Sequence, residues 1–199
     1  MATAREAIRL PASAPTSAAI VRRAIEFIGD HVSASLESVP TKTIDRAIDL
    51  LQKAPAIFVY GAGRSGIIGR AFAMRLVQLG LTAYVIGESV TPIVRRGDVV
   101  FILSARGESY SSMQTANIVR REGADLIVLT ARPTSKLAHA ATLLIAPNLP
   151  ENGERAELAP LGTLFEAASL RLTDAFVAAL MRARGETEES MRSRHAIMV

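Results

Sequence analysis

The sequence predicts an α/β fold: a doubly wound sheet of five parallel strands with helices on both faces. Between residues 56 and 146, short apolar segments alternate with segments of helical periodicity. Strand segments such as residues 99–103 are apolar without interruption, which indicates burial on both faces and therefore a parallel sheet. With 199 residues and 49% hydrophobic content, the chain is long enough for one domain with a sizeable core.

The first part of the chain is expected to be a flexible lead-in followed by two helices. Pro11 and Pro15 interrupt any helix within residues 1–15, so the single domain is expected to span residues 16–199. Thr16 or Ser17 can cap a first helix that runs to about residue 36, and Thr41 can cap a second.

The strands and the later helices follow from the alternating pattern. Strands are expected at residues 56–60, 82–86, 98–103, 125–130 and 142–146. Helices are expected at about 66–79, 110–122 and 134–140, then at 163–182 and 186–194 after a polar loop over residues 147–160. In the flavodoxin-like order 2-1-3-4-5, the first and third strands are neighbours, so the loops that follow them open into one crevice.

The first of these loops reads Gly61-Ala62-Gly63-Arg64-Ser65-Gly66. Gly61 and Gly63 allow the backbone N–H groups to approach an anion closely, the following helix adds the positive end of its dipole, and Ser65 adds a hydroxyl. This pattern predicts a phosphate site. It also matches the dinucleotide fingerprint G-x-G-x-x-G, with Glu88 at the distance of a ribose-binding acid.

The second loop follows the third strand and carries Ser104, Arg106, Ser109 and Ser111. Its hydroxyls and its guanidinium suit phosphate, and Gly107 permits a tight turn. The alternative is that these serines only cap a helix. Two phosphate-suited loops at one crevice are a more specific signal than either loop alone.

Composition and missing motifs exclude several classes of chemistry. The chain has no cysteine and three histidines without metal-ligand spacing, so neither a disulfide nor a protein-built metal site is expected. A Walker motif and a G-x-S-x-G elbow are missing from the sequence. The net charge of +4 comes from scattered arginines and only 5% of residues are aromatic, so nucleic acid is not the expected partner. No apolar segment suits a membrane span or a secretory signal, and a cytoplasmic location is expected.

Two residues outside the loops are candidate acid–base groups. Glu166 opens the long helix directly after the polar loop, although its spacing from Thr163 also fits a capping box. His195 lies near the C-terminus, where a histidine is usually a solvated tail residue.

The chain closely resembles the sugar isomerase (SIS) domain of the 6-phospho-3-hexuloisomerases. The resemblance lies in residues 61–66, 69–76, 85–88 and 162–166 and in Arg194-His195-Ala196. The resemblance implies interconversion of D-arabino-hex-3-ulose 6-phosphate and fructose 6-phosphate in the ribulose monophosphate route of formaldehyde assimilation. It also implies a cytoplasmic enzyme without a cofactor, typically a homotetramer.

The same resemblance implies roles for individual residues. Ser65, Ser104 and Ser109 correspond to phosphate-binding hydroxyls, Glu166 to the catalytic base, and His195 to a site histidine that a neighbouring subunit could supply. The chain departs from the family at Arg106, where a serine is usual and which could bind phosphate more strongly or fill the pocket. It departs again at its tail, where residues 197–199 replace Asn-Leu-Glu.

Three other functions are consistent with these patterns. One is a related isomerase for arabinose or heptose phosphates, which would share both loops. Another is a sugar-phosphate sensor without catalysis, which would normally carry a fused DNA-binding domain; residues 1–55 have no convincing helix-turn-helix. The third is a dinucleotide enzyme, which would leave the second serine loop and Glu166 without a role.

Overall fold

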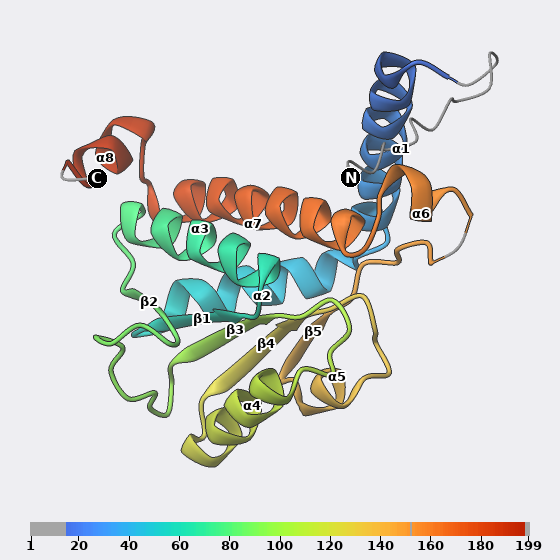
Figure 1. The fold of residues 1–199 in the computed structure, drawn as a ribbon. Helices are drawn as coiled ribbons and strands as arrows, with labels where there is room; N and C mark the ends of the chain where they lie inside the picture. Colours follow the sequence, from blue (N-terminus) through green and yellow to red (C-terminus); the bar gives the residue numbers. More distant parts are fainter. Residues whose placement is uncertain (1–14, 152, 198–199) are drawn as a thin grey trace, which may run out of the picture.

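A computed structural model describes residues 15–151 and 153–197, so the expected lead-in lies outside the described residues except for Pro15. The five strands form one parallel sheet in the order β2-β1-β3-β4-β5, which confirms the predicted fold class (Figure 1). Each lies within one residue of its expected bounds: β1 Ile57–Gly61, β2 Ala83–Val85, β3 Val99–Leu103, β4 Asp125–Leu129 and β5 Leu143–Ile145.

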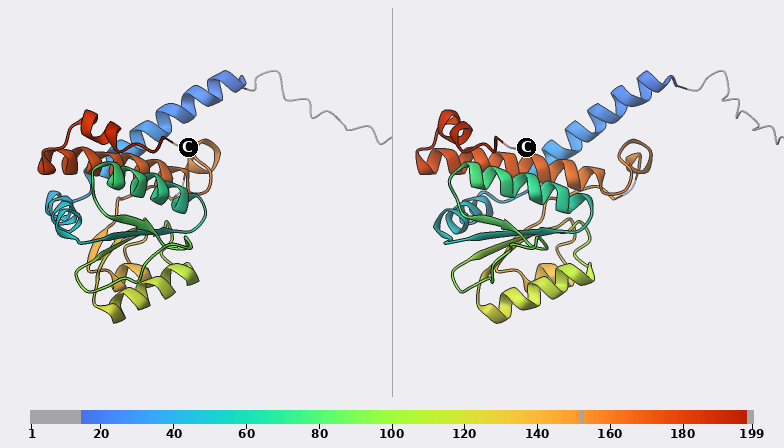
Figure 2. Two further views of the ribbon diagram at one scale, coloured as in Figure 1. Left: turned by 90° about the vertical axis from the view of Figure 1, so that its left-hand side faces the viewer. Right: turned by 60° about the vertical axis from the view of Figure 1, so that its left-hand side comes forward.

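Helices cover both faces of the sheet, as its apolar strands require (Figure 1). One face packs against α2 (Thr41–Lys53), α3 (Arg64–Gln78) and α7 (Thr163–Arg184), and the other against α4 (Tyr110–Glu122) and α5 (Lys136–Ala140). Helix α1 (Ser17–Glu37) packs its C-terminal part on α7 and projects from the body (Figure 2). Among the described helices, none is long and apolar enough to cross a membrane.

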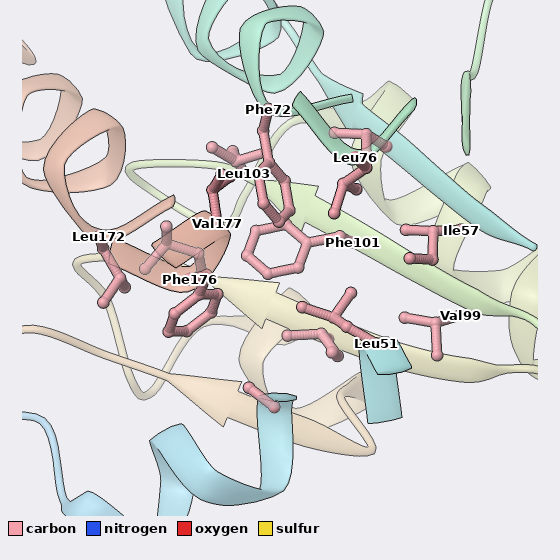
Figure 3. Close-up of a cluster of buried hydrophobic side chains, with 14 of the residues drawn as sticks. Leu51, Ile57, Phe72, Leu76, Val99, Phe101, Leu103, Leu172, Phe176 and Val177 are labelled. Atoms are coloured by element: carbon pink, nitrogen blue, oxygen red, sulfur yellow. The ribbon is translucent and has the colours of Figure 1, made fainter. Parts of the chain in front are cut away.

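The larger core cluster lies between the sheet and the layer formed by α2, α3 and α7 (Figure 3). Phe72 of α3 and Phe101 of β3 meet edge to face, with their ring centroids 5.3 Å apart. Phe176 of α7 is also fully buried against the sheet. These contacts fix α3 and α7 side by side over the sheet with their N-termini at the same end, the end at which the strands finish (Figure 1).

Two local expectations were wrong. Thr41 does not cap α2, because the carbonyl of Pro40 accepts the first helical hydrogen bonds and makes Pro40 the N-cap. The region expected to be a polar loop, residues 147–160, contains a short helix α6 (Arg155–Leu158). The charged sequence of this segment did not indicate a helix, and Leu158 is its buried residue.

The turn between β1 and α3 is closed by a direct approach of two glycines. A Cβ atom on Gly61 would lie 2.8 Å from the backbone nitrogen of Gly66, and one on Gly66 would collide with the carbonyl oxygen of Gly61. Between them, Gly63 has a φ of +58°, which favours glycine. These glycines let the chain reverse directly from strand into helix, so α3 begins at Arg64, two residues earlier than expected.

The C-terminal helix α8 (Glu188–Ser193) is anchored at the far end of α3. Arg194 donates to the carbonyl of Gln78 at 3.1 Å and forms a bidentate pair with Glu186, at 2.8 and 3.1 Å. The Arg194 guanidinium, and then the Ser190 hydroxyl, hold the pKa of Glu186 below its ordinary value of 4.5. An acid with a lowered pKa stabilises the fold above its ordinary pKa and loses that contribution as pH falls through the lowered value.

Replacing Gly66 by Ala should lower the free energy of unfolding by about 1–3 kcal/mol, because the new methyl group meets fixed backbone. Urea unfolding measures the change. Gly29→Ala in α1, where a Cβ atom meets nothing within 4 Å, is the matched control and should raise stability by about 0.5–1 kcal/mol. Equal stability of Gly66→Ala and the wild type would contradict the close approach of the two glycines.

Replacing Glu186 by Gln should lower the melting temperature at pH 7 but not at a pH below the lowered pKa of Glu186. Thermal unfolding of both proteins between pH 3 and pH 7 measures this difference. The control is Glu188→Gln, which removes an exposed pair with Arg192 on the same helix and should change little at any pH. A difference that does not depend on pH would rule out the ion pair as its cause.

Candidate active site

The two predicted phosphate loops meet because β1 and β3 pair in register to their last residues, Gly61 opposite Leu103. The loops that follow enclose a cavity of about 170 Å³. We call this cavity the serine clamp. It is lined by Ser65 from the first loop and by Ser104, Arg106 and Ser109 from the second loop. The structure thus brings four of the predicted site residues together, and Gly61 and Gly63 shape the turn beside them.

The three serine hydroxyls of the clamp reach it from different elements. Ser65 lies on the first turn of α3 and Ser104 directly after β3, and both are 8% exposed. Ser104 Oγ accepts a hydrogen bond from Gly107 N at 3.2 Å. Ser109 occupies the N-cap position of α4, yet its side chain accepts no helix N–H and instead lies 2.9 Å from Ser111 Oγ. The explanation of Ser109 as a helix-capping serine is therefore wrong, and its hydroxyl remains able to meet a ligand.

Helices α3 and α4 both begin at the clamp, and their N-termini can stabilise a negative charge there. The N–H groups of Arg64 and Ser65 in α3, and of Tyr110 and Ser111 in α4, precede the first possible intrahelical hydrogen bond. The positive ends of both helix dipoles lie at the same place. Hydroxyls, free N–H groups and two dipoles together make a site for a phosphate group.

The second loop is held rigidly against the segment that follows β4. Ala105 O accepts hydrogen bonds from Ala131 N at 3.1 Å and from Thr130 Oγ1 at 3.2 Å. Gly107 has a φ of +63° and packs so closely on Ser135 that a Cβ atom there would collide with the serine side chain. Arg106 therefore projects from a backbone that is fixed on both sides.

Glu166 lies on the first turn of α7 with its side chain only 13% exposed. It does not form the alternative capping box, because Gly162 is the N-cap and Thr163 Oγ1 donates to Pro160 O at 2.6 Å. Arg64 Nε lies 2.9 Å from Glu166 Oε2. The N–H does not point along this line, so the buried Oε2 accepts no hydrogen bond from the described residues. A buried carboxylate oxygen that is held by an ion pair and not by a hydrogen bond is unusual, and it leaves Glu166 Oε2 able to accept a proton.

A second cavity, of about 300 Å³, is lined by Arg106 and also by Phe165, the residue before Glu166. Gly162 lines it, and a Cβ atom on Gly162 would lie only 3.0 Å from Glu166 Oε1. Next to it, Leu161 has a φ of +58° and is 92% exposed, and Arg155 donates a hydrogen bond to its carbonyl oxygen at 2.8 Å. Such a strained non-glycine residue is typical of a functional site.

His195 does not join the other predicted residues within one chain. It lies exposed at the end of α8, where its Nδ1 is 2.9 Å from the carbonyl oxygen of Ala196. Helix α8 contacts the C-terminal end of α3, whereas the clamp lies at its N-terminal end (Figure 1). The 15 residues of α3 separate these ends by about 22 Å.

The predicted ribose-binding acid is also engaged elsewhere. Arg70 Nη1 lies 2.5 Å from Glu88 Oε1, so this carboxylate is paired with the outer face of α3. Within residues 15–151 and 153–197, no group of three His, Cys, Asp or Glu side chains could hold a metal ion.

Sequence reasoning missed three arginines near the predicted site residues. Arg64 links the first loop to Glu166, and Arg132 and Arg155 line the larger cavity. One signal was available: Arg132 follows β4, the neighbour of β3, and the carboxyl ends of parallel strands lie at the same edge of the sheet. Arg155 could not have been found in this way, because it lies on the unexpected helix α6.

Comparison with known proteins places this arrangement in a family. The SIS domain model matches residues 50–181. The chain is 35% identical over 162 residues to the 3-hexulose-6-phosphate isomerase of Bacillus subtilis, which covers 79% of this chain and 88% of that one. It is 33% identical over 144 residues to the arabinose 5-phosphate isomerase of Salmonella typhi, across 70% of this chain but only 43% of that one.

A solved structure shows the same fold. The crystal structure of a Methanococcus jannaschii protein, for which the function of a 3-hexulose-6-phosphate isomerase was inferred, superimposes with a TM-score of 0.81 at 26% identity. It covers 89% of this chain and 99% of that chain. The chain therefore belongs to the SIS domain family of sugar-phosphate isomerases and, within it, is a relative of the 3-hexulose-6-phosphate isomerases.

Proposed function

We propose that this protein is a 6-phospho-3-hexuloisomerase, which interconverts D-arabino-hex-3-ulose 6-phosphate and fructose 6-phosphate. The observation that carries the proposal is the connection between the clamp and Glu166. Arg64 directly precedes Ser65 of the clamp, and its side chain pairs with Glu166. In this proposal the clamp holds the 6-phosphate, and the cavity beside Gly162 receives the other end of the sugar. The location would be the cytoplasm, and the pathway the ribulose monophosphate route.

The chemistry needs a base and no external oxidant. Removal of the proton on C2 by Glu166 gives an enediolate across C2 and C3, and return of the proton to C3 leaves the carbonyl at C2. Substrate and product have the same formula, so no cofactor has to supply or take electrons. The hydroxyl proton moves between the two oxygens, and we assign this transfer to His195. Binding of the remote phosphate positions C2 beside the carboxylate.

His195 can reach this site only from another copy of the chain, so we also propose a homo-oligomer. The outer face of α3 exposes Ile67, Met74 and Val77, each 46–67% exposed, and Leu170 of α7, the helix packed on α3, is also exposed. A two-fold axis across the middle of α3 would lay the C-terminal end of one α3 over the N-terminal end of the other. The α8 helix of one copy would then lie at the clamp of the other. Resemblance to the family suggests that two such pairs form a tetramer.

The first experiment is an assay of substrate choice. The protein should convert hexulose 6-phosphate to fructose 6-phosphate, followed through a coupled readout, faster than it converts arabinose 5-phosphate. The second substrate tests the alternative raised by the Salmonella typhi relative. Binding of sugar phosphate without turnover of either substrate would instead favour a sensor.

Replacing Glu166 by Gln should lower kcat at least about 100-fold, with little change in the affinity for fructose 6-phosphate, because general base catalysis contributes that much. Steady-state kinetics and calorimetry measure the two quantities. Glu157→Gln, the same change at an exposed position of α6, is the control and should keep full activity. Near-normal turnover of Glu166→Gln would rule out this residue as the base.

Mixing two inactive variants tests whether each site receives His195 from the neighbouring subunit. Glu166→Gln and His195→Ala, unfolded together and refolded, should recover up to about a quarter of the wild-type activity, because half of the random pairs contain one intact site of two. Each variant refolded alone is the control. If the mixture stays as inactive as its components although the subunits have exchanged, His195 does not act across the interface.

A further inference from the structure

Arg106 stands where three cavities meet. It lines the serine clamp, the cavity of about 300 Å³ beside Gly162, and a third cavity of about 330 Å³ over Thr134 and Ser135. Its side chain is exposed, and no carboxylate or carbonyl of the described residues pairs with its guanidinium. The clamp alone does not account for this placement, because Arg106 faces two spaces outside it.

Arg132 lines both of these outer cavities together with Arg106. It projects from the segment after β4, where its N–H donates to Thr130 Oγ1 at 3.1 Å. The segments that carry the two arginines are joined by the Ala131–Ala105 hydrogen bond, so the spacing of their backbones is set before any ligand arrives. Two guanidinium groups facing one space favour an anion between them, and a preformed arrangement lowers the entropic cost of binding it.

One nitrogen of the Arg132 guanidinium already forms an ion pair with a carboxylate of the same chain. Glu151 Oε1 lies 2.6 Å from Arg132 Nη1, and both side chains are about half exposed, at 53% and 56%. An exposed pair of this kind contributes little stability, so a ligand anion can replace it. Glu108 also lines the third cavity and adds a second negative charge there. The cavity beside Gly162 has the clearer positive excess, with Arg106, Arg132 and Arg155 against Glu151 alone.

We propose that Arg106 and Arg132 form a second anion position next to the serine clamp, so that the site binds sugar phosphates that carry another phosphate or carboxylate group at their far end. The inference rests on the proposed function in one respect, because the clamp must hold the first phosphate. Arg106 lies between the two positions and is shared by them. Such a ligand would act as a competitor or as an additional substrate of the same site.

Calorimetry on the full chain at low salt tests the proposal with fructose 6-phosphate and fructose 1,6-bisphosphate. The wild type should bind the bisphosphate about five- to tenfold more tightly, as one added charge-assisted contact predicts. Arg132→Ala should remove this preference and leave the affinity for the monophosphate within about twofold, since the end of fructose 6-phosphate that enters the cavity lined by Arg132 carries no charge. Glu151→Gln, which removes the competing carboxylate, should increase the preference.

Arg121→Ala is the control, because it also removes one positive charge but lies on α4 outside the three cavities, with its side chain 74% exposed. It should change neither affinity. The ligand 6-phosphogluconate, with a carboxylate at its far end, shows whether the second position accepts a carboxylate or only a phosphate. Thermal unfolding of each variant shows whether it is folded.

The proposal is wrong if the wild type binds both fructose phosphates equally or the monophosphate more tightly, or if Arg132→Ala weakens both alike. If only the proposed function is wrong, the result is different: the protein binds fructose 1,6-bisphosphate more tightly than fructose 6-phosphate but does not isomerise hexulose 6-phosphate. Normal isomerisation without the preference, conversely, overturns only the second anion position.

Discussion

The site depends on the parallel pairing of β1 with β3, which continues to Gly61 opposite Leu103. Because both strands end at the same level, each following loop starts at the same edge of the sheet, and the helices behind the loops, α3 and α4, cover opposite faces. Two helix N-termini thus approach one point from two sides. An anion there meets hydroxyls and unpaired N–H groups from both loops, which neither loop could provide alone.

Close backbone contacts give these loops little freedom to move. The first is closed where Gly61 meets Gly66, and the second where Gly107 packs on Ser135. A side chain at any of the three glycines would collide with fixed atoms, so the glycines are needed for space as much as for conformation. Rigid loops hold polar groups in place before the ligand binds, and this preorganisation lowers the cost of binding.

Charge connects the clamp to the rest of the site. Arg64 belongs to the phosphate loop and also contacts the buried carboxylate of Glu166, so the anion-binding part and the acid–base part meet through one side chain. Arg106 extends the positive region away from the clamp toward Arg132. The same arginine that departs from the family pattern therefore lines the clamp and faces the adjoining cavities, and its rigid backbone allows both.

The sequence by itself determined the fold class, the strand order and the serine clamp, because uninterrupted apolar strands and loop glycines are local signals with few structural solutions. It did not show the contact of Arg64 with Glu166 or the convergence of Arg106 and Arg132, since these pairs join segments far apart in the chain. It also left open where His195 lies. Only the tertiary structure placed that residue at the opposite end of α3 from the clamp, because the path of the chain after α7, and not local pattern, decides where α8 packs.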